Sequence, residues 1–143
     1  MKTRYSSLVD VKKNMMQKSE RVVLSKKSAM ANADEALKIS YEDLQLIHSP
    51  EHGKITDFLS TRTLFDSQRA LISHNEKWLT FAKKEYIMAQ EQLKKDTIEF
   101  EKFQYLEAVE IEKELKIRKI KEAKDLDEIA LITHARKDKE KVA

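Results

Sequence analysis

Apolar residues recur every seven positions along most of the chain. Before residue 48 they form two neighbouring columns, Leu8, Met15, Val22, Ala29, Ala36 and Val9, Met16, Val23, Met30, Leu37, Leu44. After residue 54 there is one cleaner column, Phe58, Phe65, Ile72, Leu79, Tyr86, Leu93 and Phe100, flanked by Leu64, Leu71 and Trp78. Offset by three from this column come Ala82, Ala89 and Phe103, with polar breaks at Thr61, Gln68, Asn75 and Asp96. A seven-residue repeat with a three-four offset forms one stripe of a supercoiled helix. The pattern therefore predicts long helices whose polar breaks help to fix the register of packing.

One segment interrupts the helical pattern, and it contains the single proline and the single glycine of the chain. Pro50 cannot donate a backbone hydrogen bond and disfavours the α conformation in the residue before it. We expect Ser49 to cap a short helical turn that Gly53 ends, and Thr56 or Asp57 to cap the second helix. The prediction is an all-α fold in a single domain, residues 1–143: an antiparallel coiled-coil hairpin with helices over about 4–47 and 56–138 and a turn at 48–54.

The two predicted helices differ in length. At 1.5 Å per residue they measure roughly 65 Å and 120 Å. The first helix is therefore expected to leave the second uncovered after about residue 100. That remainder carries Ile111, Leu115, Ile117, Ile120, Leu126 and Ile129, which depart from the seven-residue column. An uncovered apolar helix is marginal in water, so we expect this stretch to be frayed alone or held by another protein or a second copy.

Composition agrees with a helical hairpin. Charged residues make up 37% of the chain, well above the ordinary quarter, and the net charge is only +3. The basic bias lies in residues 2–27, a solvated face or a surface for an acidic protein or anionic lipid. There is no cysteine, no apolar run long enough for a membrane span and no visible secretion signal, so a cytoplasmic location is expected.

The sequence contains no clear pattern of catalytic or metal-binding residues. Residues 48–52 match the H-x-x-E-H zinc pattern, but Pro50 lies inside it, and zinc binding needs both histidines on one helix face. A two-helix hairpin offers no pocket that shifts carboxylate pKa values, and one glycine cannot build a phosphate-binding loop. Basic residues are interleaved with acids, which disfavours nucleic-acid binding. We expect a protein that is not an enzyme and holds no cofactor or metal.

Two short segments resemble the FliJ family of flagellar export proteins. Residues 5–12, Tyr-Ser-Ser-Leu-Val-Asp-Val-Lys, resemble its opening, and residues 121–130, Lys-Glu-Ala-Lys-Asp-Leu-Asp-Glu-Ile-Ala, resemble its charged C-terminal stretch. The length and the layout of one helix, one turn and a longer helix are also similar. The resemblance implies a stalk of the flagellar type III export apparatus, similar in shape to the gamma subunit of rotary ATPases. Such a stalk is a monomer when free and associates peripherally with the inner-membrane apparatus.

The resemblance also implies partners and their sites. The joined terminal ends would enter the hexameric export ATPase (FliI-like), and the region near the turn would reach the cytoplasmic domain of the export gate (FlhA-like), with export chaperones as further partners. By position, the gate-contact residues are Leu44, Ile47, Leu64, Leu71 and His74, with Tyr41 as the nearest counterpart of the family's tyrosines. The ATPase-contact residues near the termini are Lys12, Lys13, Leu126 and Ile129. An apolar surplus near the turn, which includes Phe58 and Trp78, supports a partner site there.

Two other interpretations stay open at the level of sequence. A generic coiled-coil adaptor or self-assembling rod has the same heptad pattern. The equivalent stalk of a virulence-type secretion system has a similar layout.

Overall fold

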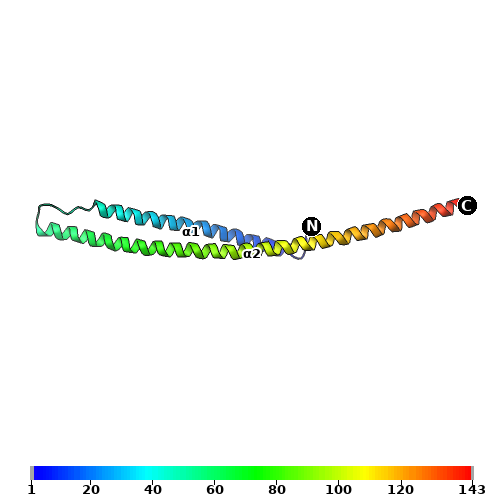
Figure 1. Ribbon diagram of the computed structural model, residues 1–143, viewed down its shortest axis with the longest axis horizontal. Coiled ribbons are helices and arrows are strands. Elements are labelled where there is room, and N and C mark those ends of the chain that lie inside the picture. The colour runs from blue at the N-terminus through cyan, green and yellow to red at the C-terminus, as the bar shows by residue number, and fades with distance from the viewer. Residues whose placement is uncertain (1, 143) are drawn as a thin grey trace. The chain divides into compact units, whose positions relative to one another are not determined.

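The computed structural model describes residues 2–142 as two helices, α1 (Ser6–Leu46) and α2 (Ile55–Val142) (Figure 1). Both predicted helices are confirmed, and the second is the longer, with 88 residues against 41. The chain forms two compact units. Unit 2 comprises residues 14–98, and unit 1 comprises the described residues of 1–13 and 99–143. Along the described chain, neither helix has a stretch long and apolar enough to cross a lipid bilayer.

In unit 2 the two helices run antiparallel and pack closely, as two polar contacts between them demonstrate. Ser19 Oγ donates a hydrogen bond to Asp96, and Asn75 Nδ2 donates one of 2.5 Å to Ser40 Oγ. From Ser19 to Ser40 is 21 residues forward along α1, and from Asp96 to Asn75 is 21 residues backward along α2. Three heptads on one helix therefore match three heptads on the other, which is the packing predicted for a coiled-coil hairpin.

Small side chains dominate the buried part of this seam. Ala33, Ala82 and Leu79 form a buried cluster, with Met30 and Leu37 packed against it. Ile72 and Ala89 are buried as well. The α2 column is confirmed from Phe65 onward, whereas Phe58 is exposed. Of the two α1 columns, the one that contains Met30 faces the seam, and the one that contains Met15 and Val22 lies at its exposed edge.

Polar residues complete the seam on both helices. The breaks predicted on α2 do lie there: Asn75 is buried, and Gln68 Nε2 donates a 2.8 Å hydrogen bond to the Ser40 carbonyl oxygen. The seam residues of α1 include Lys12, Ser19, Lys26, Ala33 and Ser40, a column that the apolar pattern did not reveal and that Ile47 continues just after the helix. Lys26 pairs with Glu85 at 3.5 Å. Every buried side-chain polar atom among the described residues has a hydrogen-bond partner, so the polar layers fit the seam without an unsatisfied group.

The connection between the helices is extended and does not form the short helical turn expected at Ser49 and Pro50. Residues 47–50 are irregular and 51–53 bend. Continuing the register of unit 2 by one heptad places Ile47 opposite residue 68, although α2 begins at Ile55. About the first four turns of α2 therefore lie beyond the end of α1 (Figure 1). Ser49 lines a hollow there with Phe58 and Phe65.

The predicted caps of the second helix are wrong by two or three residues. Lys54 precedes the helix, and its backbone N–H donates to Asp57 Oδ2 at 3.2 Å, so Asp57 acts from the third helical position. Gly53 has φ +151°, a conformation that L side chains rarely adopt. A Cβ atom added there would lie 2.8 Å from Asp57 Oδ2. Glycine is therefore required at this position by its backbone conformation and by the cap beside it.

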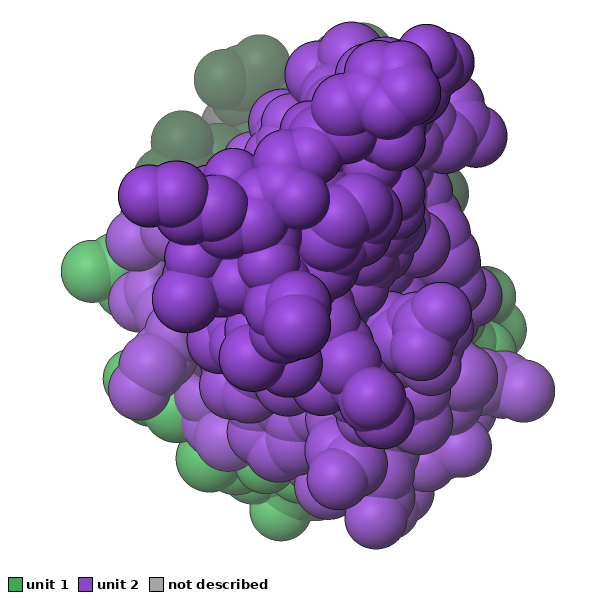
Figure 2. All heavy atoms as spheres, turned by 90° about the vertical axis from the view of Figure 1, so that its left-hand side faces the viewer, with its two compact units in different colours: residues 1–13, 99–143 green, residues 14–98 purple. Residues whose placement is uncertain are grey.

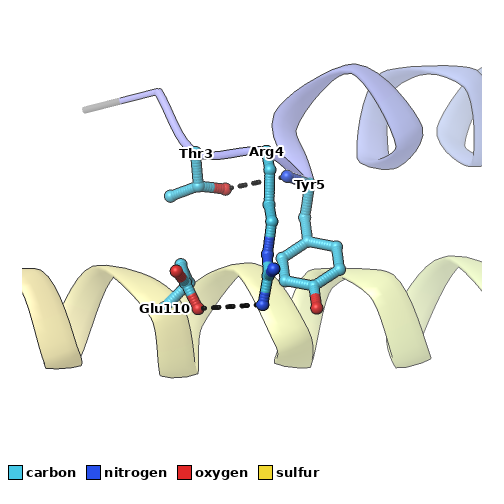
Figure 3. A network of polar contacts seen from close by, with 4 residues as sticks. All are labelled: Thr3, Arg4, Tyr5 and Glu110. Atoms are coloured by element: carbon cyan, nitrogen blue, oxygen red, sulfur yellow. Dashed lines mark hydrogen bonds and ion pairs between the residues drawn. The ribbon is translucent and has the colours of Figure 1, made fainter.

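In unit 1 the N-terminal residues pack antiparallel on α2, further along than expected. Lys12 pairs with Glu99 at 3.8 Å, and Arg4 pairs with Glu110 at 3.8 Å (Figure 3). The first turn of α1 is held by Thr3, whose hydroxyl accepts the Tyr5 N–H at 3.1 Å. Partly buried residues on α2 continue to residue 114. The prediction that the first helix covers the second only to about residue 100 is therefore wrong. The extended connection shifts the residues of α2 that pair with α1 toward the C-terminus.

Beyond residue 114 the second helix has no cover within the described chain. Every residue from 115 to 141 is exposed. Its ion pair between Lys116 and Glu112 and its polar contact between His134 and Asp138 are local contacts within α2. The prediction of an uncovered apolar stretch is confirmed, with its beginning moved to residue 115.

Candidate partner-binding surfaces

The residues expected at the gate-contact site fall into two groups. Leu44 on α1 and Ile47, the first residue after it, are both partly buried, so they support the packing of the hairpin. Leu64, Leu71 and His74 are exposed on α2. Their spacing of seven and three places these three residues on one face of α2, beside the seam.

The exposed face continues away from the connection through two large aromatic residues. Trp78 and Phe81 line a shallow groove with His74 and Lys77, and their exposed fractions are 40% and 61%. We name the face formed by Leu64, Leu71, His74, Trp78 and Phe81 the α2 stripe. Phe81 was missed from the sequence, although its distance of seven residues from His74 was the available signal. Figure 2 views unit 2 (purple) end-on, from the end that carries the connection between α1 and α2.

An exposed apolar stripe of this kind suits protein contact. Leu71 is 45% exposed and Leu64 57% exposed, so each retains apolar area that a partner can remove from water. Aromatic side chains such as Trp78 are the common anchors of protein interfaces. The stripe is an open surface suited to binding a partner, and it forms no enclosed pocket.

Tyr41 does not join the α2 stripe. Its hydroxyl donates a 2.5 Å hydrogen bond to Glu76 Oε1. Glu76 directly follows the seam residue Asn75, whereas Leu71 directly precedes the seam residue Ile72, so Glu76 and Leu71 flank opposite sides of the seam. The hydrogen bond to the Glu76 carboxylate raises the pKa of Tyr41 above its ordinary value. Tyr41 thus supports the pairing of the two helices on the side opposite the stripe.

A second hollow lies beside the connection. It is lined by Ser49, Phe58, Phe65 and the polar residues Thr61, Arg62, Asp66 and Arg69. Phe58, one of the residues of the apolar surplus expected near the turn, is 43% exposed there.

The four residues expected at the ATPase-contact site are not one cluster. Lys12 is occupied within the chain, because its ammonium group pairs with Glu99 and lies 5.7 Å from the centre of the Phe103 ring. Lys13 is exposed next to it. Leu126 and Ile129 are exposed in the uncovered stretch, with exposed fractions of 66% and 59%. Glu99, the partner of Lys12, precedes Leu126 by 27 residues of helix, about 40 Å at the helical rise.

The segment with the zinc-like pattern does not form a helix. His48 and His52 lie in the irregular connection and are exposed, so they are not presented one turn apart on a helix face. Within residues 2–142, no group of three or more His, Asp or Glu side chains is placed to hold a metal ion.

Comparison with known proteins gives one family. No match was found among curated proteins or among solved structures. The family described as "Flagellar FliJ protein" matches residues 1–139 of the 143-residue chain. This match includes α1, the connection and all but the end of α2, and it agrees with the resemblance of residues 5–12 and 121–130. The chain therefore belongs to the FliJ family of flagellar proteins.

Proposed function

We propose that this chain is a stalk that couples the export ATPase ring to the export gate. Membership of the FliJ family makes it a component of the flagellar type III export apparatus. In the proposal, a hexameric FliI-like ATPase binds near the termini, and the cytoplasmic domain of a FlhA-like gate binds near the connection. The protein also escorts export chaperones, and it resides on the cytoplasmic side of the inner membrane at the apparatus.

The observation that carries the proposal is the presence of two separate exposed apolar surfaces on one helix. The α2 stripe as defined ends at Phe81, Met88 continues its spacing by one more heptad with 54% exposure, and the uncovered stretch begins at Leu115. Between them, the α2 seam residues Ala82, Tyr86, Ala89 and Leu93 are buried or partly buried. Exposed apolar residues also occur between them, such as Ile98 and Tyr105, but the stripe and the uncovered stretch are 34 residues apart on one helix, so they are suited to two different partners.

The packing of the two surfaces supports the same assignment. The uncovered stretch carries Leu126 and Ile129, which no residue of the described chain covers. When a partner binds this stretch, no contact within the chain has to break, because no other part of the chain packs against it. The α2 stripe lies on a helix that α1 already stabilises, so it presents a preformed surface.

Binding assays with purified partners test the proposal. The full chain is titrated separately with the cognate export ATPase, with the gate domain and with an export chaperone. Leu71→Ser should weaken binding to the gate domain by about tenfold or more and leave ATPase binding unchanged. Leu126→Ser combined with Ile129→Ser should have the reverse effect. Lys84→Ala, on the exposed side of unit 2, should change neither.

Two results would overturn the proposal. One is the absence of binding to both the ATPase and the gate domain. The other is concentration-dependent self-assembly of the free chain in sedimentation experiments, which a structural rod requires and a stalk does not.

A further inference from the structure

A shallow groove runs between the two helices in the middle of unit 2. It is lined by Met30, Ala31 and Asp34 of α1 and by Leu79 and Lys83 of α2. Asp34 precedes Tyr41 by seven residues, so the two lie on one face of α1. Lys83 follows Glu76, the hydrogen-bond partner of Tyr41, by the same spacing on α2. The groove therefore lies on the side of the Tyr41 contact, opposite the α2 stripe.

Two exposed aliphatic residues extend the apolar part of this groove. Leu24 lies seven residues before Ala31 on the same face of α1, and Ile87 lies one turn beyond Lys83 on α2. The exposed fractions of Leu24 and Ile87 are 65% and 53%. The floor is formed by side chains that the hairpin already packs, and the short side chain of Ala31 leaves room above it for a residue from another protein. We name the surface formed by Leu24, Met30, Ala31, Leu79, Lys83 and Ile87 the central groove.

Lysines without a partner surround the central groove. Lys27 lies one turn before Ala31, and Lys94 lies seven residues after Ile87. Within residues 2–142, neither of them nor Lys83 forms an ion pair.

The acids on this side of the hairpin are occupied within the chain. Asp34 pairs with Lys38 at 3.3 Å, and Glu76 accepts the hydrogen bond of Tyr41. The nearest other acids, Glu35 and Glu91, lie on the outer flanks of the two helices, one turn beyond Ala31 and Ile87. The central groove therefore carries unpaired positive charge beside its apolar residues.

The shape and charge of the central groove fit an amphipathic helix. A helix that lies between two packed helices places its apolar stripe on their shared floor. From Leu24 to Lys38 the groove extends over 14 residues, about 21 Å or four helical turns. A lipid surface is broad, so it would touch the outer flanks without reaching Leu79. A second copy that used the same groove would bring like charges together, whereas a helix flanked by carboxylates would complement them.

We infer that the central groove binds an amphipathic helix of an export chaperone, whose apolar stripe packs on Leu24 and Ile87 and whose carboxylates face the unpaired lysines. The inference rests on the proposed function, in which the chaperone has no assigned surface. It goes further by placing the contact on the side opposite the α2 stripe. It also specifies the charge of the partner and requires residues from both helices.

Neighbouring residues of α2 provide a matched pair of apolar variants. Ile87 lies in the central groove, and Met88, which is 54% exposed, lies about 100° around the helix toward the α2 stripe. The full chain is titrated with the purified cognate chaperone. We expect Ile87→Ser to weaken binding by about tenfold and Met88→Ser to leave it unchanged. Leu24→Ser should have the same effect as Ile87→Ser, because the helix contacts α1 and α2 together.

A second matched pair tests the charge of the partner. Lys94 and Lys95 are both exposed, and only Lys94 shares the face of Ile87. In about 0.05 M salt, Lys94→Glu should weaken chaperone binding by about five- to tenfold, and the effect should shrink in about 0.3 M salt. Lys95→Glu should change binding little. Circular dichroism and the urea midpoint from Trp78 fluorescence should match the unmodified chain, because all the substituted residues are exposed.

The outcomes separate this inference from the proposed function. If the chaperone binds but Ile87→Ser and Leu24→Ser have no effect, or if Met88→Ser weakens binding instead, the central groove is wrong and the chaperone contact stands. If Lys94→Glu and Lys95→Glu act alike, the acidic character of the partner helix is wrong. If the unmodified chain does not bind the chaperone, the inference and the proposed escort of chaperones both fail, whereas the proposed contacts with the ATPase and the gate domain are unaffected.

Discussion

Asn75→Asp is a stringent test of the polar layer in the seam, because it changes one amide into a carboxylate of the same size. Asn75 is 7% exposed, and its Nδ2 donates to Ser40 Oγ at 2.5 Å and to the Ala36 carbonyl oxygen at 3.3 Å. Ser40 Oγ already donates to the same carbonyl at 2.6 Å. The aspartate would therefore replace a donor with an acceptor opposite two oxygen atoms.

The expected loss follows from these contacts. Two hydrogen bonds of about 1 kcal/mol each disappear, and a buried carboxylate without a donor adds a further 1–2 kcal/mol or more. At neutral pH we expect Asn75→Asp to lower the free energy of unfolding by about 3–4 kcal/mol. This is a large part of the 5–15 kcal/mol typical of a folded domain, so the hairpin of unit 2 would be close to unfolding.

The same change should depend on pH in a defined direction. Burial beside oxygen atoms raises the pKa of the introduced carboxyl in the folded state above its ordinary value near 4. Below the ordinary pKa, the group is protonated in both states and can donate to the Ala36 carbonyl, so most of the loss disappears. The destabilisation grows as the pH rises through the ordinary pKa, and it is complete above the folded pKa.

Urea denaturation followed by Trp78 fluorescence measures this effect, since Trp78 is the only tryptophan and lies in unit 2. The matched control is Asn32→Asp, the same substitution at an exposed position of α1. We expect Asn75→Asp to be far less stable than the control at pH 7.5 and to approach it at pH 4. Equal stability of the two variants at pH 7.5 would refute the buried polar layer and the register derived from it.

Three further predictions concern the connection, the Tyr41 contact and the uncovered stretch. Gly53→Ala should destabilise unit 2 by about 1–2 kcal/mol in urea melts, through its strained backbone and the contact with Asp57; an unchanged midpoint would contradict the positive φ. Glu76→Gln should lower the pKa of Tyr41 toward its ordinary value in a spectroscopic titration. Because that pKa is raised in the folded state, the stabilisation by this contact is present below about pH 10 and is lost as the pH rises through the folded pKa. An unchanged Tyr41 pKa would exclude Glu76 as its cause. Deletion of residues 115–143 should leave the Trp78 midpoint unchanged while total helicity falls, and a lower midpoint would show that the stretch supports unit 2.

The α2 side of the seam was predictable from sequence because one column of large apolar residues is longer than its neighbour. The column of Phe65, Ile72 and Leu79 continues to Phe100, whereas the flanking column of Leu64, Leu71 and Trp78 ends at Glu85, and polar breaks such as Asn75 keep the same spacing. On α1 two adjacent columns were equally apolar, so the pattern could not decide between them. The column that contains Lys12, Ser19, Lys26 and Ser40 has too few apolar residues to be recognised without its partner helix.

The register in which α1 pairs with α2 could not be predicted from the sequence, because it depends on the conformation of the connection. Proline and glycine at positions 50 and 53 indicated a break in the helix and left its extent open. The extended connection places the end of α1 opposite residue 68, and this one feature moves the end of cover from about residue 100 to residue 114. The α2 stripe, in contrast, could be read from spacing alone up to Trp78.

Hydrogen exchange along α2, measured with and without the export ATPase, tests the central claim most directly. The account predicts that amides in residues 115–142 of the free chain exchange rapidly, that amides around Ala82 and Ala89 are protected, and that addition of the ATPase slows exchange across 115–142. Two results would contradict the claim that this stretch is uncovered and binds a partner. One is protection of the amides of 115–142 in the free chain at micromolar concentration, and the other is exchange there that the ATPase leaves unchanged.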